Sequence, residues 1–207
     1  MTFPVTAFHY DKSTSLLFIG LSNSSLSGKI NNYFSKLFSG NSSNSTENTP
    51  GFLLIYNIIK NNSGAQHFEL IYEKALPSEV SSINFYENQN YLCVGMNNGG
   101  ILVHKIFVNE SSKVTRDLLE ELCLIKAHKK KVIGCCINFT YGYVYSVARD
   151  NNLIIAEMNY QSIIKNIQLT KKEISCMFYD QEWGRLFLTD DSGSIWILDL
   201  TTNTVTN

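Results

Sequence analysis

The chain has 207 residues, a formal net charge of −1 and an aromatic content of 12% with only three prolines. Its length allows a substantial hydrophobic core, while its near-neutral charge provides no general attraction to nucleic acid or acidic membranes. No segment is long and apolar enough to span a membrane. The start, MTFPVTAFHY, lacks the basic segment and long apolar run of a signal peptide.

The first part of the chain predicts strands that are separated by an insertion. Val5–Gly20 predicts two strands, the second at Leu16–Ile19, and Gly51–Ile58 predicts a third. Residues 21–50 lie between them as an insertion. Its second half, Asn41–Pro50, is a polar, low-complexity stretch whose composition is typical of disordered segments.

The first half of the insertion contains a candidate docking helix, KINNYFSKLF. Its apolar residues recur at helical spacing and would form one face of a helix: these are Ile30, Tyr33, Phe34, Leu37 and Phe38. A helix of this length is marginal alone in water, so some surface must stabilise it. The sequence leaves three alternatives open: it lies on its own molecule, it is never ordered, or it docks onto a partner or membrane.

Three windows in the rest of the chain align without a gap: Val80–Ile106, Val132–Met158 and Ile174–Leu200. Each reads as three short strands joined by tight turns, which is typical of an antiparallel meander. In the middle window we expect strands at Val132–Phe139, Tyr143–Val147 and Leu153–Met158. The windows begin 52 and 42 residues apart, near the blade spacing of a β-propeller.

Two sets of equivalent positions support this alignment. Leu92, Val144 and Leu186 open the second strand of each window. Gly99, Asn151 and Gly193 share the second turn, where a residue that tolerates positive φ is needed.

The first part of the chain and each of the three windows also need an outer, fourth strand. We expect these strands at His67–Tyr72, at Leu122–Ile125 with a helical turn before it, and at Gln161–Leu169. In the last window, TTNTVTN ends where the outer strand should begin. The sequence therefore predicts an all-β fold of about four four-stranded units, spanning approximately 1–75, 76–126, 127–170 and 171–207, with the last one incomplete.

The residues from Ala127 to Asp150 resemble a known family. Ala127-His128, three residues and then Val132 resemble the Gly-His-x-x-x-Val that opens a blade of WD-repeat β-propellers, and Ser146 and Asp150 match the serine and aspartate that follow. In that family the three polar side chains form a hydrogen-bonded chain that usually ends on the tryptophan of a Trp-Asp pair. The pair is replaced here by Ala156-Glu157, His104-Lys105 and Leu198-Asp199.

A narrower resemblance covers Leu76–Leu200. The stretches YLCVGMNNGGI, IKAHKKKV and RLFLTDDSGSIWILDL resemble the early blades of proteins that join a WD-repeat propeller to a phosphoinositide-binding FYVE zinc finger. This resemblance implies a non-enzymatic scaffold for protein–protein contact in endosomal membrane traffic. It also implies a cytoplasmic protein, peripheral on endosomal membranes, whose lipid contact is made by a domain outside this chain.

His128, Ser146 and Asp150 have two interpretations. As a trio they could suggest a catalytic triad, but the resemblance implies a buried structural group. The sequence has no nucleophile elbow, phosphate-binding loop or HExxH motif. We therefore expect no enzymatic activity.

Lys126, Lys129, Lys130 and Lys131 form the densest basic run of the sequence. The first interpretation is a solvated loop. The alternative is an anion site on the rim of a propeller, which would make the chain a phosphoinositide-binding or anion-binding module acting at membranes. We do not expect nucleic acid as the partner.

The five cysteines are Cys93, Cys123, Cys135, Cys136 and Cys176. None has metal-ligand spacing, and adjacent Cys135 and Cys136 point to opposite faces of a strand. An odd number of unpatterned cysteines suits a reducing compartment. We expect buried thiols that fill space, and neither a metal nor a cofactor.

Four blades are at the low end of the range for a closed propeller, and the family resemblance implies about seven. The sequence leaves two alternatives: the chain is the first half of a longer propeller, or two copies close a ring of about eight blades. For the 207-residue chain we expect self-association through the outer faces of the first and fourth units, because exposed apolar faces drive association.

Overall fold

The computed structural model describes residues 4–22, 51–60, 64–107, 119–200 and 204–206, and contains sixteen β-strands and no helix in these ranges. They form four sheets of four strands, which are called blades one to four from here on. Blade one holds β1 (Val5–Asp11), β2 (Leu16–Ser22), β3 (Gly51–Lys60) and β4 (Gln66–Leu76). Blade two holds β5 (Val80–Tyr86), β6 (Tyr91–Met96), β7 (Gly100–Ile106) and β8 (Leu119–Lys126). Blade three holds β9 (Val132–Asn138), β10 (Tyr143–Ala148), β11 (Asn152–Glu157) and β12 (Ser162–Gln168), and blade four holds β13 (Ile174–Asp180), β14 (Arg185–Asp190), β15 (Ile195–Asp199) and β16 (Thr204–Thr206).

Every blade is an antiparallel meander in which the strands pair in chain order. The turn between the second and third strand requires a left-handed residue, and φ is +83° at Gly99, +65° at Asn151 and +83° at Gly193. Glycine and asparagine tolerate this conformation better than other residues. The predicted equivalence of these three turns is therefore confirmed.

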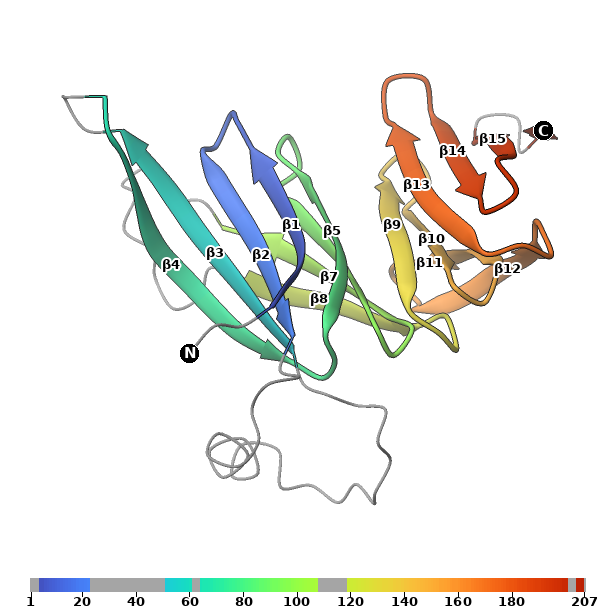
Figure 1. The fold of residues 1–207 in the computed structure, drawn as a ribbon, viewed down its shortest axis with the longest axis horizontal. Coiled ribbons are helices and arrows are strands. Elements are labelled where there is room, and N and C mark those ends of the chain that lie inside the picture. Colours follow the sequence, from blue (N-terminus) through green and yellow to red (C-terminus); the bar gives the residue numbers. More distant parts are fainter. Residues whose placement is uncertain (1–3, 23–50, 61–63, 108–118, 201–203, 207) are drawn as a thin grey trace, which may run out of the picture.

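The blades stand face to face and form a partial ring (Figure 1). Their first strands, β1, β5, β9 and β13, lie side by side in this order. Three equivalent side chains are fully buried between the sheets, each at the second residue of β6, β10 or β14: Leu92, Val144 and Leu186. Alternating apolar residues thus build a core between successive blades, and the predicted all-β fold of four-stranded blades is confirmed.

Most strands differ from their predicted bounds by a few residues at their ends, and the start of β8 differs in kind. β8 is a strand from Leu119, so the helical turn expected before Leu122 is wrong for these residues. Cys123 pairs with Val103 and Ile125 pairs with Ile101, and both β8 side chains are buried. This packing outweighs the helical propensity of Leu119–Leu122.

The fourth blade does have an outer strand, although a short one. β16 pairs with β15 over three residues, Thr204–Thr206. The expectation that the chain ends before its outer strand is thus corrected to a blade with four strands.

Candidate functional site

His128 joins the loop before blade three to the turns inside that blade. Its Nε2 lies 2.9 Å from Ser146 Oγ, and its Nδ1 lies 3.1 Å from Asp150 Oδ1. Asp150 also accepts the backbone N–H of Lys129 at 3.1 Å and that of Asn152 at 3.2 Å. The structure therefore brings the three residues of the predicted hydrogen-bond group together, on the loop, on β10 and on the β10–β11 turn.

The electrostatics of this group favour a neutral histidine. Burial lowers the pKa of His128, and the Asp150 carboxylate beside it opposes this shift. A neutral ring donates from Nδ1 to Asp150 and accepts from the Ser146 hydroxyl at Nε2. Ser146 and the His128 ring that it contacts are both buried. The arrangement can hold a loop in place, and it presents no exposed nucleophile to a substrate.

The same loop is fixed to blade two by the turn at Gly99. The backbone N–H of His128 donates to the Gly99 carbonyl at 3.0 Å. A Cβ atom on Gly99 would lie 2.0 Å from the His128 carbonyl oxygen. Glycine is therefore needed here both for its positive φ and for the close approach of two backbones.

Blade four contains a polar group that the sequence analysis did not identify. Asp190 accepts from the Thr170 hydroxyl at 3.0 Å, the Trp196 indole N–H at 3.3 Å and the Ser192 backbone N–H at 2.9 Å. The Ser192 hydroxyl also donates to Asp190, and this bond, followed by the others, holds the pKa of Asp190 below its usual range. Thr170 stands 42 residues after His128, which is also the offset between the windows of blades three and four, so the alignment itself was the available signal.

His104 occupies the position of the family's tryptophan in blade two and connects this blade to blade one. It is fully buried, and its Nε2 lies 3.1 Å from the Lys74 ammonium of β4. Lys74 also forms an ion pair with Glu121 at 2.9 Å. Burial, followed by the charge of Lys74, lowers the pKa of His104 to about 4. The ring is therefore a neutral acceptor at neutral pH.

The basic loop lies beside the entry to blade four. Lys126, Lys129 and Lys130 are exposed and Lys131 is half-buried. The Lys131 carbonyl accepts the backbone N–H of Arg149 at 2.9 Å. The Arg149 side chain in turn pairs with Glu173 at 2.9 Å. These contacts bring the basic loop close to the chain segment that holds the exposed pair Lys171-Lys172.

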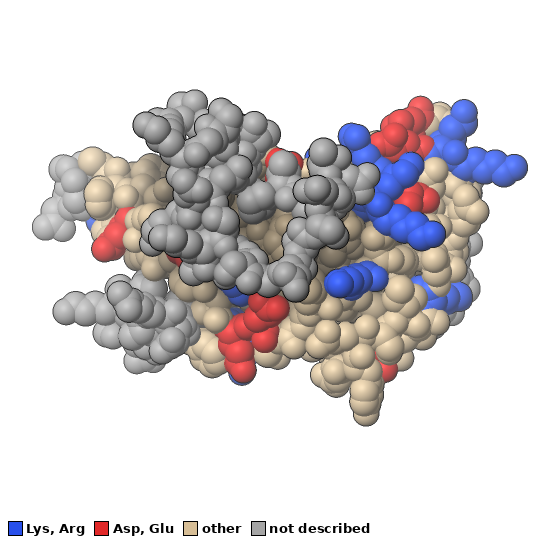
Figure 2. Space-filling view, turned by 90° about the horizontal axis from the view of Figure 1, so that it is seen from below, with Lys and Arg blue, Asp and Glu red and all other residues tan. Residues whose placement is uncertain are grey.

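Figure 2 shows Lys and Arg side chains gathered at one end of the face seen from below, with acidic side chains among them. The mixture of signs weakens the local field, because Glu173 already neutralises Arg149.

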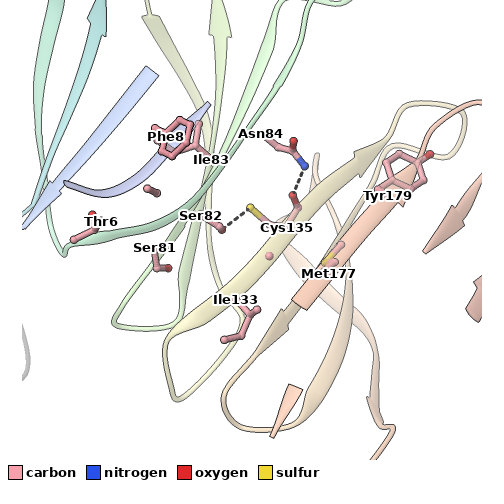
Figure 3. Close-up of a pocket in the computed structure, with 12 residues that line it drawn as sticks. Thr6, Phe8, Ser81, Ser82, Ile83, Asn84, Ile133, Cys135, Met177 and Tyr179 are labelled. Atoms are coloured by element: carbon pink, nitrogen blue, oxygen red, sulfur yellow. Dashed lines mark hydrogen bonds between the residues drawn. The ribbon is translucent and has the colours of Figure 1, made fainter. Parts of the chain in front are cut away.

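The first strands of the four blades line a hollow of about 380 Å³ (Figure 3). Its lining includes Phe8 of β1, Ser82 of β5, Ile133 of β9 and Tyr179 of β13. Across it, Asn84 donates from its side-chain amide to the Cys135 carbonyl at 3.2 Å. No Lys, Arg, Asp, Glu or His lines the hollow, so it suits an uncharged occupant.

Other features bear on the remaining expectations. Within the described ranges, no three His, Cys, Asp or Glu side chains gather as a metal site would require. Four of the five cysteines are buried, and Cys176 is exposed. The candidate docking helix, with Ile30, Tyr33, Phe34, Leu37 and Phe38, lies outside the described residues.

None of the described segments is a helix that could cross a membrane.

No protein-family model and no curated protein matches the sequence. Three solved structures resemble the fold at low sequence identity. A chain of the mitotic checkpoint complex has a TM-score of 0.64 and 13% identity over 99% of this chain and 50% of its own. The WD40 β-propeller domain of Doa1 has a TM-score of 0.62 and 12% identity over 98% and 53%. The β-propeller domain of Cps50 (Swd1) from Myceliophteria thermophila has 0.64 and 14% over 96% and 51%.

The chain thus spans about half the length of these three structures. Its fold, four consecutive antiparallel blades in a partial ring, is that of a WD40 β-propeller segment.

Proposed function

We propose that this chain is a non-enzymatic scaffold that binds protein partners at the hollow formed by its first strands. The observation that carries this proposal is the composition of that hollow, to which all four blades contribute and which contains no charged side chain. The polar residues that could perform chemistry, His128, Ser146 and Asp150, bond to one another elsewhere. The low-identity likeness to WD40 propellers agrees with a binding role by analogy of fold.

The hollow also offers polar groups to a peptide backbone. Thr6, Ser81, Ser82 and Asn84 contribute hydroxyl and amide groups to its lining. Phe8 and Tyr179 provide aromatic surface at the two sides of the same hollow. An extended, uncharged segment with apolar and hydroxyl side chains would satisfy both kinds of group.

The endosomal setting of this scaffold is part of the proposal and rests on the sequence resemblance to FYVE-linked propellers. In that setting the protein is cytoplasmic and peripheral on endosomal membranes. The lipid contact would then belong to a separate domain.

A charge placed in the hollow tests the scaffold function. Ile133→Glu adds a carboxylate to the uncharged lining, and Ile164→Glu makes the same change on the exposed outer strand β12. Affinity purification of each variant from the cells that express the protein should lose a defined set of partners with Ile133→Glu only. Identical partner sets for the wild type and both variants would contradict binding at the hollow.

The basic loop supports a second candidate, an anion-binding surface for phosphoinositide headgroups. Its support is the proximity of Lys129 and Lys130 to Lys171 and Lys172 across the Arg149–Glu173 ion pair. Association through such charges weakens as salt rises. In vesicle flotation with and without phosphoinositides, replacing Lys129, Lys130 and Lys131 by Glu should abolish any lipid-dependent binding. Flotation that changes neither with salt concentration nor with these substitutions would exclude the basic loop as the lipid-binding site.

A further inference from the structure

Blade four presents an apolar face on which two large side chains are more than half exposed. Strand pairing places Phe178, Phe187 and Ile197 opposite one another on this face, with Ile195 beside them. Phe178 is 62% exposed and Ile195 is 56% exposed. The Phe178 and Phe187 ring centroids are 6.3 Å apart. These four residues are called the trailing face of blade four.

The equivalent positions of the preceding blades are covered by the blade that follows each of them. Ile195 corresponds to Ile101 in blade two and to Leu153 in blade three, at offsets of 94 and 42 residues. Both of these side chains are fully buried. The residues that correspond to Phe187, Cys93 and Tyr145, are buried as well. The trailing face is therefore half of a blade-to-blade contact whose other half is missing from the described chain.

Blade one presents the complementary half. Tyr10, Leu17, Ile19 and Leu54 share the face directed away from blade two, since Tyr10 pairs with Leu17 and Ile19 pairs with Leu54. Tyr10 is 48% exposed and the other three are half-buried. These four residues are called the leading face of blade one.

The corresponding residues of blade two are buried against blade one; the equivalents of Tyr10, Leu17 and Ile19 lie 75 positions later, and that of Leu54 lies 48 positions later. They are Phe85, Leu92, Val94 and Leu102. The leading face of blade one therefore consists of the positions that, in blade two, are covered by the blade before it.

We propose that two copies of this chain associate head to tail, with the leading face of blade one of each copy on the trailing face of blade four of the other. The contact repeats the three blade-to-blade contacts already present inside the chain. Because the chain spans about half the length of solved propellers, two copies supply a ring of comparable size. A net charge of −1 per copy leaves the association without strong electrostatic repulsion.

Both contacts form at once in such a ring. A head-to-tail contact that closes gives a discrete dimer instead of a filament. The expected solution state of the 207-residue chain is therefore a dimer whose dissociation exposes both faces together.

Two single substitutions test the contact from its two sides. Tyr10→Asp places a negative charge on the leading face, and Ile195→Lys places a positive charge on the trailing face. Both side chains are about half exposed in the single chain, so the fold should tolerate the changes. Tyr160→Asp, in the exposed turn between β11 and β12, is the matched control outside both faces. Circular dichroism checks that each variant is folded, and Phe178→Lys replaces Ile195→Lys if the latter is not.

Sedimentation velocity over the micromolar range should show a dimer for the wild type and for Tyr160→Asp, and a monomer for each face variant alone. An equal mixture of the two face variants should form dimers again, because one contact remains intact and the other pairs Asp with Lys. A monomeric wild type would overturn the proposal and leave the faces to another partner. Dimerisation of either face variant alone, or no dimer in the mixture, would overturn the head-to-tail arrangement.

Cys176 provides a second readout that needs no substitution. It is the exposed member of the five cysteines and belongs to β13, where it pairs with Thr189 next to Ile195. Its reaction with a thiol reagent should slow several-fold as wild-type protein is concentrated, and should not slow for Ile195→Lys. If the reaction rate of Cys176 did not depend on the concentration of the wild-type protein, this would count against a contact that covers the trailing face.

Discussion

The joint between blades two and three can be compared with the trailing face of blade four. Both are built from equivalent positions of the repeat, but the side chains at these positions differ in chemistry. At the joint, the Ile137 backbone N–H donates to the Tyr86 hydroxyl at 2.8 Å and the Asn84 amide donates to Cys135 at 3.2 Å. In blade four the position of Asn84 is held by Phe178, which is exposed. An internal joint is thus specified by directional hydrogen bonds, whereas an exposed Phe178 can make only non-directional apolar contacts at the same position.

The sharpest test of this contrast compares two glycines with the same backbone conformation. Gly99 and Gly193 both have φ +83°, but a Cβ on Gly99 meets the His128 backbone and one on Gly193 meets nothing within 4 Å. Gly99→Ala should cost roughly 4 kcal/mol of unfolding free energy through strain and overpacking. Gly193→Ala should cost only about 1 kcal/mol through strain alone. Urea unfolding measures both, and equal losses would mean that the Gly99 contact adds nothing.

Truncation at equivalent core positions should show the next largest difference. Leu153→Ala empties a fully buried site and should cost about 3 kcal/mol. Ile195→Ala, at the same register in blade four, removes an exposed side chain and should cost less than about 1 kcal/mol in the monomer. The comparison is made by urea unfolding at a protein concentration where sedimentation finds only monomer. A large loss for Ile195→Ala there would show that the trailing face is already packed within one chain.

The stability of the joint between blades one and two should depend on pH because of His104. Its pKa is about 4 when folded, against an ordinary value near 6.5, so the unfolded chain binds the proton first. The stability contributed by the neutral ring is complete above about pH 6.5 and is lost as pH falls towards 4. The loss should reach on the order of 3 kcal/mol, and His128 contributes in the same direction.

His104→Gln should flatten this part of the pH–stability profile, and His67→Gln, on an exposed residue of β4, should not. Thermal unfolding at closely spaced pH values provides the measurement. A profile that keeps its slope in His104→Gln would assign the pH dependence to other buried groups, such as His128.

The smallest expected effect concerns the lock inside blade three. Asp150→Ala removes the acceptor for His128 and for two backbone N–H groups, and should cost about 2 kcal/mol. Because the group is structural in this interpretation, partner binding at the hollow should be retained below the lowered melting temperature. An unchanged melting temperature together with a lost activity would show that the group does more than hold the loop.

The repeat made much of this fold predictable. Gly99, Asn151 and Gly193 mark the same turn, and local backbone chemistry is enough to identify it. The start of β8, Leu119–Leu122, was misinterpreted because the pairing of Cys123 and Ile125 with β7 is not a local property. The bonds of Asp190 could not be predicted from the motif, because Thr170 and Ser192 stand where the alignment places His128 and Asp150.

Leu153 and Ile195 show a property that a sequence pattern does not predict. The two residues are chemically alike and stand at the same register, and one is buried while the other is exposed. Periodicity identifies which face of a strand is apolar. It does not say whether another sheet covers that face, because that depends on what comes next in space.

The pairing of β2 with β3 has a consequence for protein engineering. Their ladder continues to Ser22 and Gly51, although residues 23–50 come between these two partners. The Ser22 hydroxyl donates to Glu79 of blade two, and Gly51 lies against the Glu79 backbone, so both ends of the connection are anchored. Since the entropy of closing a loop grows only slowly with its length, we expect the connection between Ser22 and Gly51 to accept an insertion. A reporter or an epitope grafted there would leave the strand register unchanged.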